Sequence, residues 1–358
     1  MPVMKVIVLY GGISTEHEVS VHSAQTVCRT LASQPEKYTV YPVFISKTGR
    51  WFLQQKCGPQ TPQDIAITPV LEDGVTFRSL QGNVAVRADV VFPVLHGTNG
   101  EDGVMQGFLE TLQIPYVGCN VLASAIGMDK ELSKRMAQAT GVPIVAYRKI
   151  TKEAPYDEVQ LLHWAQRQGY PLFVKPVRLG SSVGVRKVTS PKELPQAIAF
   201  ALQFDTAVLV EKGIEAAREI FCAVYGDAQK SYVSQPGELC QNNSEFFDYN
   251  TKYLVTGGCD MHIPADVPAP VAQAMQRDTE LIFKALQTSG LARVDFLMDR
   301  QGNYFFSEIN TIPGLSETSL FPQLFEAGDH AYSLILDRLI DLALQTYKNK
   351  KSLTVSRL

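Results

Sequence analysis

Three side chains with hard oxygen atoms stand close together near the C-terminal end of the chain. Asp295, Glu308 and Asn310 lie on two β-rich runs, RVDFLM and YFFSEIN, which the polar segment DRQGN separates. Because side chains alternate faces along a strand, Glu308 and Asn310 project from one face, and a hairpin loop with an even number of residues places Asp295 there too. Two carboxylates and an amide suit Mg²⁺. The pattern predicts a magnesium site for handling ATP; the alternative is an edge hairpin whose acidic residues face solvent.

A glycine-rich segment, RLGSSVG at residues 178–184, lies between the runs FVKP and VRKV. Glycine permits a close backbone approach to a ligand, and Ser181 and Ser182 supply neutral donors, so the segment can close over phosphates as a hairpin loop. The phosphate-loop pattern GxxxxGK[ST] and the dinucleotide pattern GxGxxG are both absent. A plain serine-rich turn remains the alternative.

Two lysines are candidate phosphate ligands by their position. Lys175 ends a predicted strand immediately before Pro176, and Lys130 follows the dipeptide MD. Most lysines in proteins are simply solvated, so only their positions in the sequence indicate that these two bind phosphate. Downstream, VLVEKGI offers an apolar strand end with Glu211, which suits an adenine edge and a ribose; a surface strand end is the alternative.

Composition excludes several classes of protein. The 358 residues include 33 Lys and Arg against 36 Asp and Glu, a net charge of −3, which argues against nucleic acid or an anionic membrane as a partner. No apolar run approaches the roughly 20 residues that a bilayer requires. Six cysteines are scattered without metal or redox spacing, as expected in a reducing compartment. We therefore expect a cytoplasmic protein.

The chain divides by pattern into three parts. It opens with a strand, MKVIVLY, a Gly11-Gly12 turn and an amphipathic helix, and a region of hairpins and loops at about 47–87 interrupts the alternation of strands and helices. We predict a parallel α/β domain at 1–119, a central subdomain with the phosphate loop at 120–213, and a C-terminal subdomain with the metal hairpin and a lid loop at 214–358.

The motifs MDK, FVKP, GSSVG, VEK, ARVD and SEINTIPG occur in the order found in the ATP-grasp ligases, which the chain resembles. YGGISTEHEVS near the start, HGTNGEDG at 96–103 and DYNTKY at 248–253 are similar to motifs of the D-alanine–D-alanine ligase family within that superfamily. The resemblance runs from residue 5 to about 340. It implies an α/β and α+β protein, an ATP-grasp fold with an N-terminal parallel α/β (Rossmann-like) domain, acting on D-alanine and ATP as a homodimer in peptidoglycan precursor synthesis.

The resemblance also implies roles for single residues. Two Mg²⁺ (or Mn²⁺) ions would be bound by Asp295, Glu308 and Asn310. ATP would be contacted by Lys130, Lys175, Ser182, Glu211, Lys212, Ile214, Glu219 and Lys252. The two substrates would be held by Glu16, His96, Ser319 and Leu320, and catalysis would use Glu16, Ser181, Tyr253, Arg293 and Gly314.

The residue types agree with that chemistry. A carboxylate becomes reactive when it is phosphorylated, and the amine that then attacks it creates an oxyanion. Arg293, two residues before Asp295, is the natural cation for this oxyanion, and the Gly314 amide is the family's second donor. Four of the implied site residues also have an ordinary structural alternative. Arg293 could form a salt bridge to a surface acid, and Glu16 could be a helix-start charge. His96 could be a satisfied structural histidine, and Ser319 could be an N-cap hydroxyl.

Two departures from the family pattern concern the nucleotide. Leu179 stands where many members carry an acidic residue, and EKGIEAARE is one residue longer than usual, which makes Glu219 a less secure contact. Tyr253 favours an amine as the second substrate, so a D-alanyl-D-lactate ligase is the less favoured alternative, as is a catalytically silent ATP-binding regulator. We expect the loop at about 240–258 to be a mobile lid.

Overall fold

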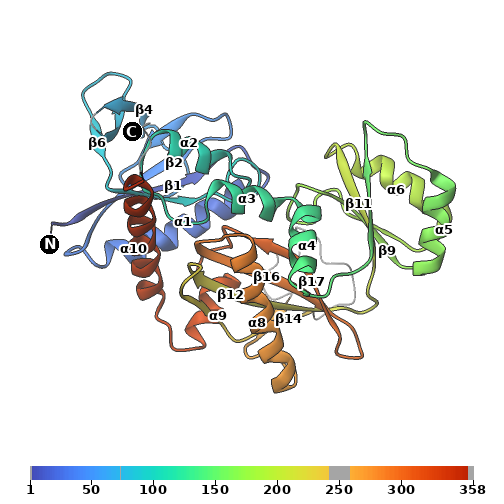
Figure 1. Cartoon of the computed structure of the whole chain (residues 1–358). Helices are drawn as coiled ribbons and strands as arrows, with labels where there is room; N and C mark the ends of the chain where they lie inside the picture. Colours follow the sequence, from blue (N-terminus) through green and yellow to red (C-terminus); the bar gives the residue numbers. More distant parts are fainter. Residues whose placement is uncertain (1, 73, 242–258, 354–358) are drawn as a thin grey trace.

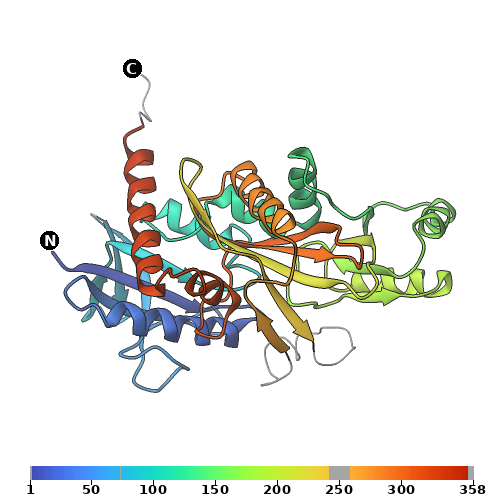
Figure 2. The ribbon, with the colours of Figure 1, turned by 90° about the horizontal axis from the view of Figure 1, so that it is seen from below.

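A computed structural model describes residues 2–72, 74–241 and 259–353, and these residues form three β-sheets arranged in a row. The seven-stranded sheet lies at one end of the molecule, the four-stranded sheet at the other, and the six-stranded sheet between them (Figures 1 and 2).

The seven-stranded sheet is parallel at one end, where the sequence predicts parallel strands. Strand β1 (Met4–Gly11) lies between β2 (Tyr38–Ile45) and β7 (Val90–Val94) and pairs in parallel with both, and β7 is buried along its whole length. Helix α1 (His17–Ala32) packs against β1, and α2 (Val104–Thr111) contributes Leu109 to the core. The predicted hairpin region extends the same sheet with antiparallel strands: β3 (Trp51–Leu53), β4 (Ile65–Glu72), β5 (Gly74–Ser79) and β6 (Ala85–Arg87).

The four-stranded sheet is antiparallel, in the order β10-β9-β11-β8. The segment RLGSSVG connects β9 to β10, as the sequence predicts. Helices α5 and α6 lie on the side away from the other sheets (Figure 1) and bury Trp164 and Ile198 against the strands. The elements are β8 (Tyr147–Thr151), α5 (Glu158–Gln168), β9 (Leu172–Pro176), β10 (Arg186–Val188), the 3-10 turn η1 (Pro191–Glu193), α6 (Leu194–Ala201) and β11 (Ala207–Lys212).

Helices cover both faces of the six-stranded sheet, and strand β12 accordingly has apolar side chains on both faces. Ile220, Cys222 and Val224 join the cluster under α8, whereas Phe221, Ala223 and Tyr225 join the cluster under α9 and α10. The elements are β12 (Arg218–Gly226), β13 (Ser231–Val233), β14 (Gly237–Gln241), β15 (Cys259–His262), α8 (Ala269–Ala285), β16 (Gly290–Met298), β17 (Tyr304–Asn310), α9 (Leu320–Glu326) and α10 (Tyr332–Lys351).

Three helices link the sheets. α3 (Val121–Met128) and α4 (Lys130–Ala139) follow caps made by the side chains of Asn120 and Asp129, and α4 packs on β17 and α8. α10 contacts α1 and β7 of the first sheet as well as β12 and β16 of the third. The first and third sheets therefore share one apolar cluster. The domain boundaries at 119/120 and 213/214 stay a prediction.

Candidate active site

The hairpin β16–β17 brings the three predicted metal ligands to one face. Asp295 stands opposite Glu308, and Arg293 stands opposite Asn310, in an antiparallel register. Directly opposed residues point to the same side of a sheet. All four side chains therefore project from one face of the hairpin.

The prediction of an even-numbered hairpin loop was wrong. Residues 299–303, an odd number, separate the two strands, and the Asp299 amide donates to the Asn303 carbonyl across the turn. A β-bulge compensates: Phe296 pairs with Phe306 but Asp295 pairs with Glu308, so Ser307 is an extra residue. Without this bulge, Glu308 would face the opposite side.

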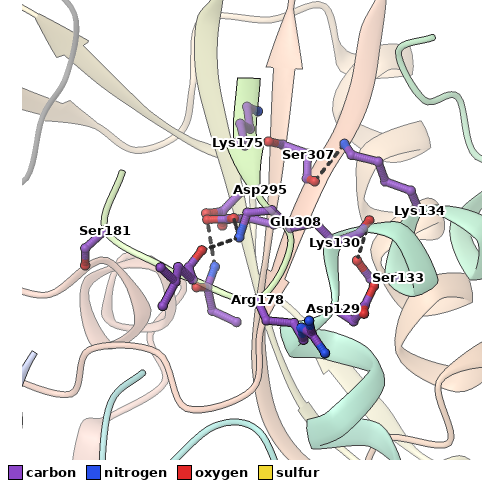
Figure 3. A network of polar contacts seen from close by, with 12 residues as sticks. Asp129, Lys130, Ser133, Lys134, Lys175, Arg178, Ser181, Asp295, Ser307 and Glu308 are labelled. Atoms are coloured by element: carbon purple, nitrogen blue, oxygen red, sulfur yellow. Dashed lines mark hydrogen bonds and ion pairs between the residues drawn. The ribbon is translucent and has the colours of Figure 1, made fainter. Parts of the chain in front are cut away.

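The metal-ligand side chains are tied into ion pairs. Arg293 binds Asp295 with both ends of its guanidinium, Nε to Oδ1 at 2.7 Å and Nη2 to Oδ2 at 2.8 Å, and Asn310 donates to the same Oδ2 at 3.1 Å. The Lys130 ammonium lies 3.1 Å from a carboxylate oxygen of Glu308 (Figure 3). Because Asp295 is 8% exposed, the alternative of a solvent-facing edge hairpin is wrong for this residue.

A cavity of about 290 Å³ lies between the four-stranded and six-stranded sheets. It contains all the described residues for which the family resemblance implies ATP contact: Lys130, Lys175, Ser182, Glu211, Lys212, Ile214 and Glu219. The carbonyl of Leu179 accepts a hydrogen bond from Lys130 at 2.7 Å, so the phosphate loop contacts this lysine through its backbone.

The carboxylate of Glu211 is bound to two lysines, and the adenine and ribose contact at this strand end stays a prediction. Glu211 is 2% exposed and forms ion pairs with Lys175 at 2.7 Å and with Lys134 at 3.2 Å; the second contact is an ion pair without good hydrogen-bond geometry. Burial alone would raise the pKa of Glu211, but the two lysines lower it to about 2. The charge of Glu211 is therefore used to hold lysines.

Lys134 escaped the sequence analysis. It follows Lys130 by one helical turn in α4, and its side chain is 1% exposed. The spacing within MDKELSK could have drawn attention to it, since residues four apart lie on the same side of a helix.

A second cavity, of about 550 Å³, adjoins the first, and five residues line both: Gly180, Ser181, Glu219, Phe221 and Glu308. Its lining includes six residues that the resemblance implies for substrate binding or catalysis: Glu16, Ser181, Arg293, Gly314, Ser319 and Leu320. The two cavities therefore meet at the metal-ligand hairpin.

Glu16 takes the N-cap position of α1, but its side chain makes no cap hydrogen bond. Its carboxylate accepts a short hydrogen bond from the Ser181 hydroxyl, which joins α1 to the phosphate loop. Gly97 has a φ of +70°, which favours glycine, and a Cβ atom there would lie 2.4 Å from Glu16 Oε2. Burial raises the pKa of Glu16 despite the Ser181 hydrogen bond. The hydrogen bond to Ser181 gives the carboxylate a partner in addition to its place at the start of α1.

The loop after β17 carries Gly314. A Cβ atom at this position would lie 2.7 Å from Ser319 Oγ, so glycine lets the two come close. The Ser319 hydroxyl accepts from the Ser316 amide at 3.1 Å and does not cap α9, which rules out the N-cap alternative. Among the described residues, the Gly314 amide donates to no acceptor.

Three side chains from the seven-stranded-sheet region hold this loop from behind. His96 Nδ1 lies 2.8 Å from the Ile312 carbonyl, and His96 Nε2 lies 3.0 Å from Ser23 Oγ, which accepts from the Leu315 amide. Glu101 accepts from the Ile312 amide at 3.2 Å and from the Gly97 amide at 2.9 Å. The backbone groups of Ile312 and Leu315, which flank the Pro313-Gly314 pair, are thereby fixed.

The placement of His96 corrects the expectation that it lies beside the first substrate. Both ring nitrogens are bonded within the protein and the residue is 4% exposed, because it supports the loop from below the cavity lining. Burial lowers the pKa of His96 to about 4, so the ring is neutral, with Nδ1 donating and Nε2 accepting. Ser23 and Glu101 were missed, although Glu101 lies in the quoted motif HGTNGEDG.

Two of the predicted site residues, Lys252 and Tyr253, lie outside the described residues, as does most of the predicted lid loop. Their roles stay predictions.

Comparisons with known proteins agree with this geometry. The sequence profile described as "D-ala D-ala ligase N-terminus" matches residues 5–119, and "D-ala D-ala ligase C-terminus" matches residues 136–341. The D-alanine–D-alanine ligase of Thermoanaerobacter sp. (strain X514) is 41% identical over 97% of this chain and 98% of its own length; that of Enterococcus hirae is 40% identical over 97% and 98%.

Solved structures are similar throughout. The D-alanine–D-alanine ligase of Coxiella burnetii has a TM-score of 0.85 at 33% identity, covering 98% of this chain and 97% of that one. The VanG D-Ala:D-Ser ligase of Enterococcus faecalis has a TM-score of 0.83 at 33% identity, covering 95% and 99%.

Proposed function

Because this chain belongs to the D-alanine–D-alanine ligase family, we propose that it joins two D-alanines into D-alanyl-D-alanine for peptidoglycan precursor synthesis, converting ATP to ADP and phosphate. One observation supports this most directly. Arg293, Asp295, Glu308 and Asn310 share the hairpin face where the nucleotide and substrate cavities meet. Such a junction suits the transfer of a phosphoryl group from one cavity to a carboxylate in the other.

The hairpin fits a hard divalent cation. In the part of the chain that the structure describes, no group of three His, Cys, Asp or Glu side chains is placed so that it could hold a metal ion. Asp295, Glu308 and Asn310 offer two carboxylates and an amide, a set that Mg²⁺ or Mn²⁺ completes with phosphate oxygens and water. We propose that these residues hold two such ions, which would supply neutralisation of the phosphate charge.

The first substrate would bind at Glu16, whose carboxylate meets Ser181 and has the charge to hold an ammonium group. The carboxylate of this first D-alanine would attack the γ-phosphate, which gives D-alanyl phosphate and releases ADP. The ammonium groups of Lys130 and Lys175 would hold the nucleotide phosphates. The position of Ser181 in both cavities supports this alignment.

The second D-alanine would place its carboxylate near Ser319 and Leu320, and its amine would attack the acyl carbon. The oxyanion formed in that step needs donors already in place. Arg293 lines the cavity, and the Gly314 amide is held by the supports at Ile312 and Leu315. Phosphate then leaves and the peptide bond remains.

Two other functions are separated by one assay. A ligase for a different second substrate has a precedent in the similar VanG D-Ala:D-Ser ligase of Enterococcus faecalis. A silent ATP-binding regulator would not need Arg293 and Gly314 together in the substrate cavity. Phosphate release should be measured with ATP, Mg²⁺ and D-alanine, alone or with D-serine or D-lactate, and the product identified by mass spectrometry. No phosphate release favours the regulator; a mixed product preferred over the D-alanine dipeptide favours the other ligase.

We also propose the three-part division at 1–119, 120–213 and 214–358, a cytoplasmic location and a homodimer. No helix in the described ranges is both long and apolar enough to cross a membrane. Apolar surface is available for a second copy: a hollow of about 860 Å³ is lined by Trp51 and by the exposed Leu80, Val104 and Phe108. Sedimentation analysis should give twice the mass of one chain, and a single-chain mass would reject the homodimer.

A further inference from the structure

Lys134 is a buried cation in the middle of the site. Its ammonium lies 3.0 Å from the Ser307 carbonyl, 3.4 Å from the Phe306 carbonyl and 3.2 Å from Glu211 Oε1. Figure 3 shows Lys134 reaching from α4 toward Ser307, next to Glu308. These neighbours are all acceptors, so the side chain is bound as a donor with three hydrogens.

The two carbonyls that Lys134 binds mark the β-bulge. In a regular strand, successive carbonyls point to opposite edges, so one ammonium cannot reach both. At Phe306 and Ser307 they converge on the same ammonium because Ser307 is the extra residue. Lys134 therefore contacts the backbone at the place that decides which face Glu308 takes.

We propose that Lys134 is a positioning residue for the divalent cation, an inference that rests on the proposed metal site. Lys134 holds the bulge at Ser307 and so keeps Glu308 opposite Asp295. Lys134 touches neither the reacting groups nor a metal ligand's side chain. Its effect on the cation passes through the backbone of residues 306–308.

The ion pair between Lys134 and Glu211 does not involve the bulge; it joins α4 to the four-stranded sheet. Glu211 lies on β11 of the four-stranded sheet and also binds Lys175, which lines the nucleotide cavity. The two carbonyl contacts of Lys134 do not involve Glu211. The two partners of Lys134 can therefore be separated by substitution.

The test is Lys134→Met, which keeps the apolar stem and removes the donors. Mn²⁺ binding to the ADP-saturated protein is measured by electron paramagnetic resonance, and amide hydrogen exchange in residues 304–310 is measured by mass spectrometry without metal. We expect Mn²⁺ affinity to fall about 10- to 100-fold, as for other supports of metal ligands, and exchange in β17 to accelerate. Circular dichroism checks folding; if the Met variant is unfolded, Lys134→Gln, which keeps polarity but is too short, takes its place.

Two controls separate positioning from general stability. Glu211→Gln should weaken ADP binding but leave amide exchange in residues 304–310, measured without metal, at the wild-type rate, because the carbonyl contacts of Lys134 do not involve Glu211. Lys149→Met removes a partly exposed lysine that pairs with Glu131 at 2.7 Å and should leave both readouts unchanged. Wild-type affinity and wild-type exchange in the Lys134 variant would overturn the inference. Absence of Mn²⁺ binding by the unaltered protein would instead overturn the proposed metal site.

Discussion

Arg293 and Asp295 are two residues apart on β16, so their side chains lie next to each other on one face of the strand. They form an ion pair with two hydrogen bonds, of 2.7 and 2.8 Å. The cation proposed for the oxyanion and a carboxylate proposed for the metal therefore neutralise each other. Both side chains are largely buried, at 15% and 12% exposure, so a change at one is felt by the other.

Arg293→Ala should retain nucleotide binding and lose turnover. Removing one donor of an oxyanion site typically lowers kcat by about 10² to 10³. ADP binding is measured by titration calorimetry and turnover by phosphate release. The matched control is Arg277→Ala, because Arg277 also pairs with a neighbouring aspartate, at 2.8 Å, but is exposed. Unchanged turnover in the Arg293 variant would remove the oxyanion assignment.

Glu16→Gln should raise KM for D-alanine without weakening ADP binding. A hydrogen bond to a charged partner contributes about 1.5–3 kcal/mol, which corresponds to roughly 10- to 100-fold in affinity. Glu18→Gln is the control on the same helix, since the Glu18 carboxylate is exposed and pairs with Lys47. Equal KM values for the two variants would show that Glu16 does not hold the ammonium group.

Glu101→Gln should weaken the support of the Gly314 loop. The two carboxylate oxygens accept from different amides, Gly97 and Ile312, whereas a glutamine turns an NH₂ group toward one of them. An unsatisfied buried amide costs about 1–3 kcal/mol. We expect a lower thermal midpoint and a lower kcat at unchanged KM for ATP. Glu153→Gln, at an exposed position, is the control; a wild-type kcat in the Glu101 variant would argue against loop positioning.

His96 should make stability fall in acid. Burial lowers the pKa of His96 to about 4 from 6.5, so between these pH values the unfolded chain binds more protons than the folded one. The stabilising contribution is complete above pH 6.5 and is lost as pH falls toward 4, by up to about 3 kcal/mol. Thermal midpoints are compared from pH 7.5 to 4.5.

The quantity to compare is the slope of the thermal midpoint against pH, rather than the midpoint at any one pH. His96→Asn keeps a donor for the Ile312 carbonyl but does not titrate, so its curve should be flatter than that of the wild type. His163→Asn alters an exposed histidine and should keep the wild-type slope. Parallel curves for His96→Asn and wild type would reject the linkage.

Much of the fold follows from local pattern. The apolar runs that become β1, β2, β7 and β9 and the periodic stretch that becomes α10 are visible in the sequence because burial imposes its own spacing. The metal-ligand hairpin was found for the same reason: carboxylates and an amide at alternating positions have few structural uses.

The supports of the site were not visible, because contacts between distant residues leave no local mark. Ser23 and Leu315 are separated by 292 positions, and Lys134 and Ser307 by 173. His96 was assigned to the substrate from its motif, although the structure gives both its nitrogens to the protein. The bulge at Ser307 was also missed, since one extra residue in a strand has no characteristic composition.

The odd-numbered turn at 299–303 and the extra residue at Ser307 offset each other arithmetically. Lengthening or shortening the hairpin by one residue would break this parity and send Glu308 to the wrong side, whereas removing one residue from each place would preserve it. Insertions and deletions here should thus be tolerated only in pairs, a restriction on length that holds whichever amino acids are involved.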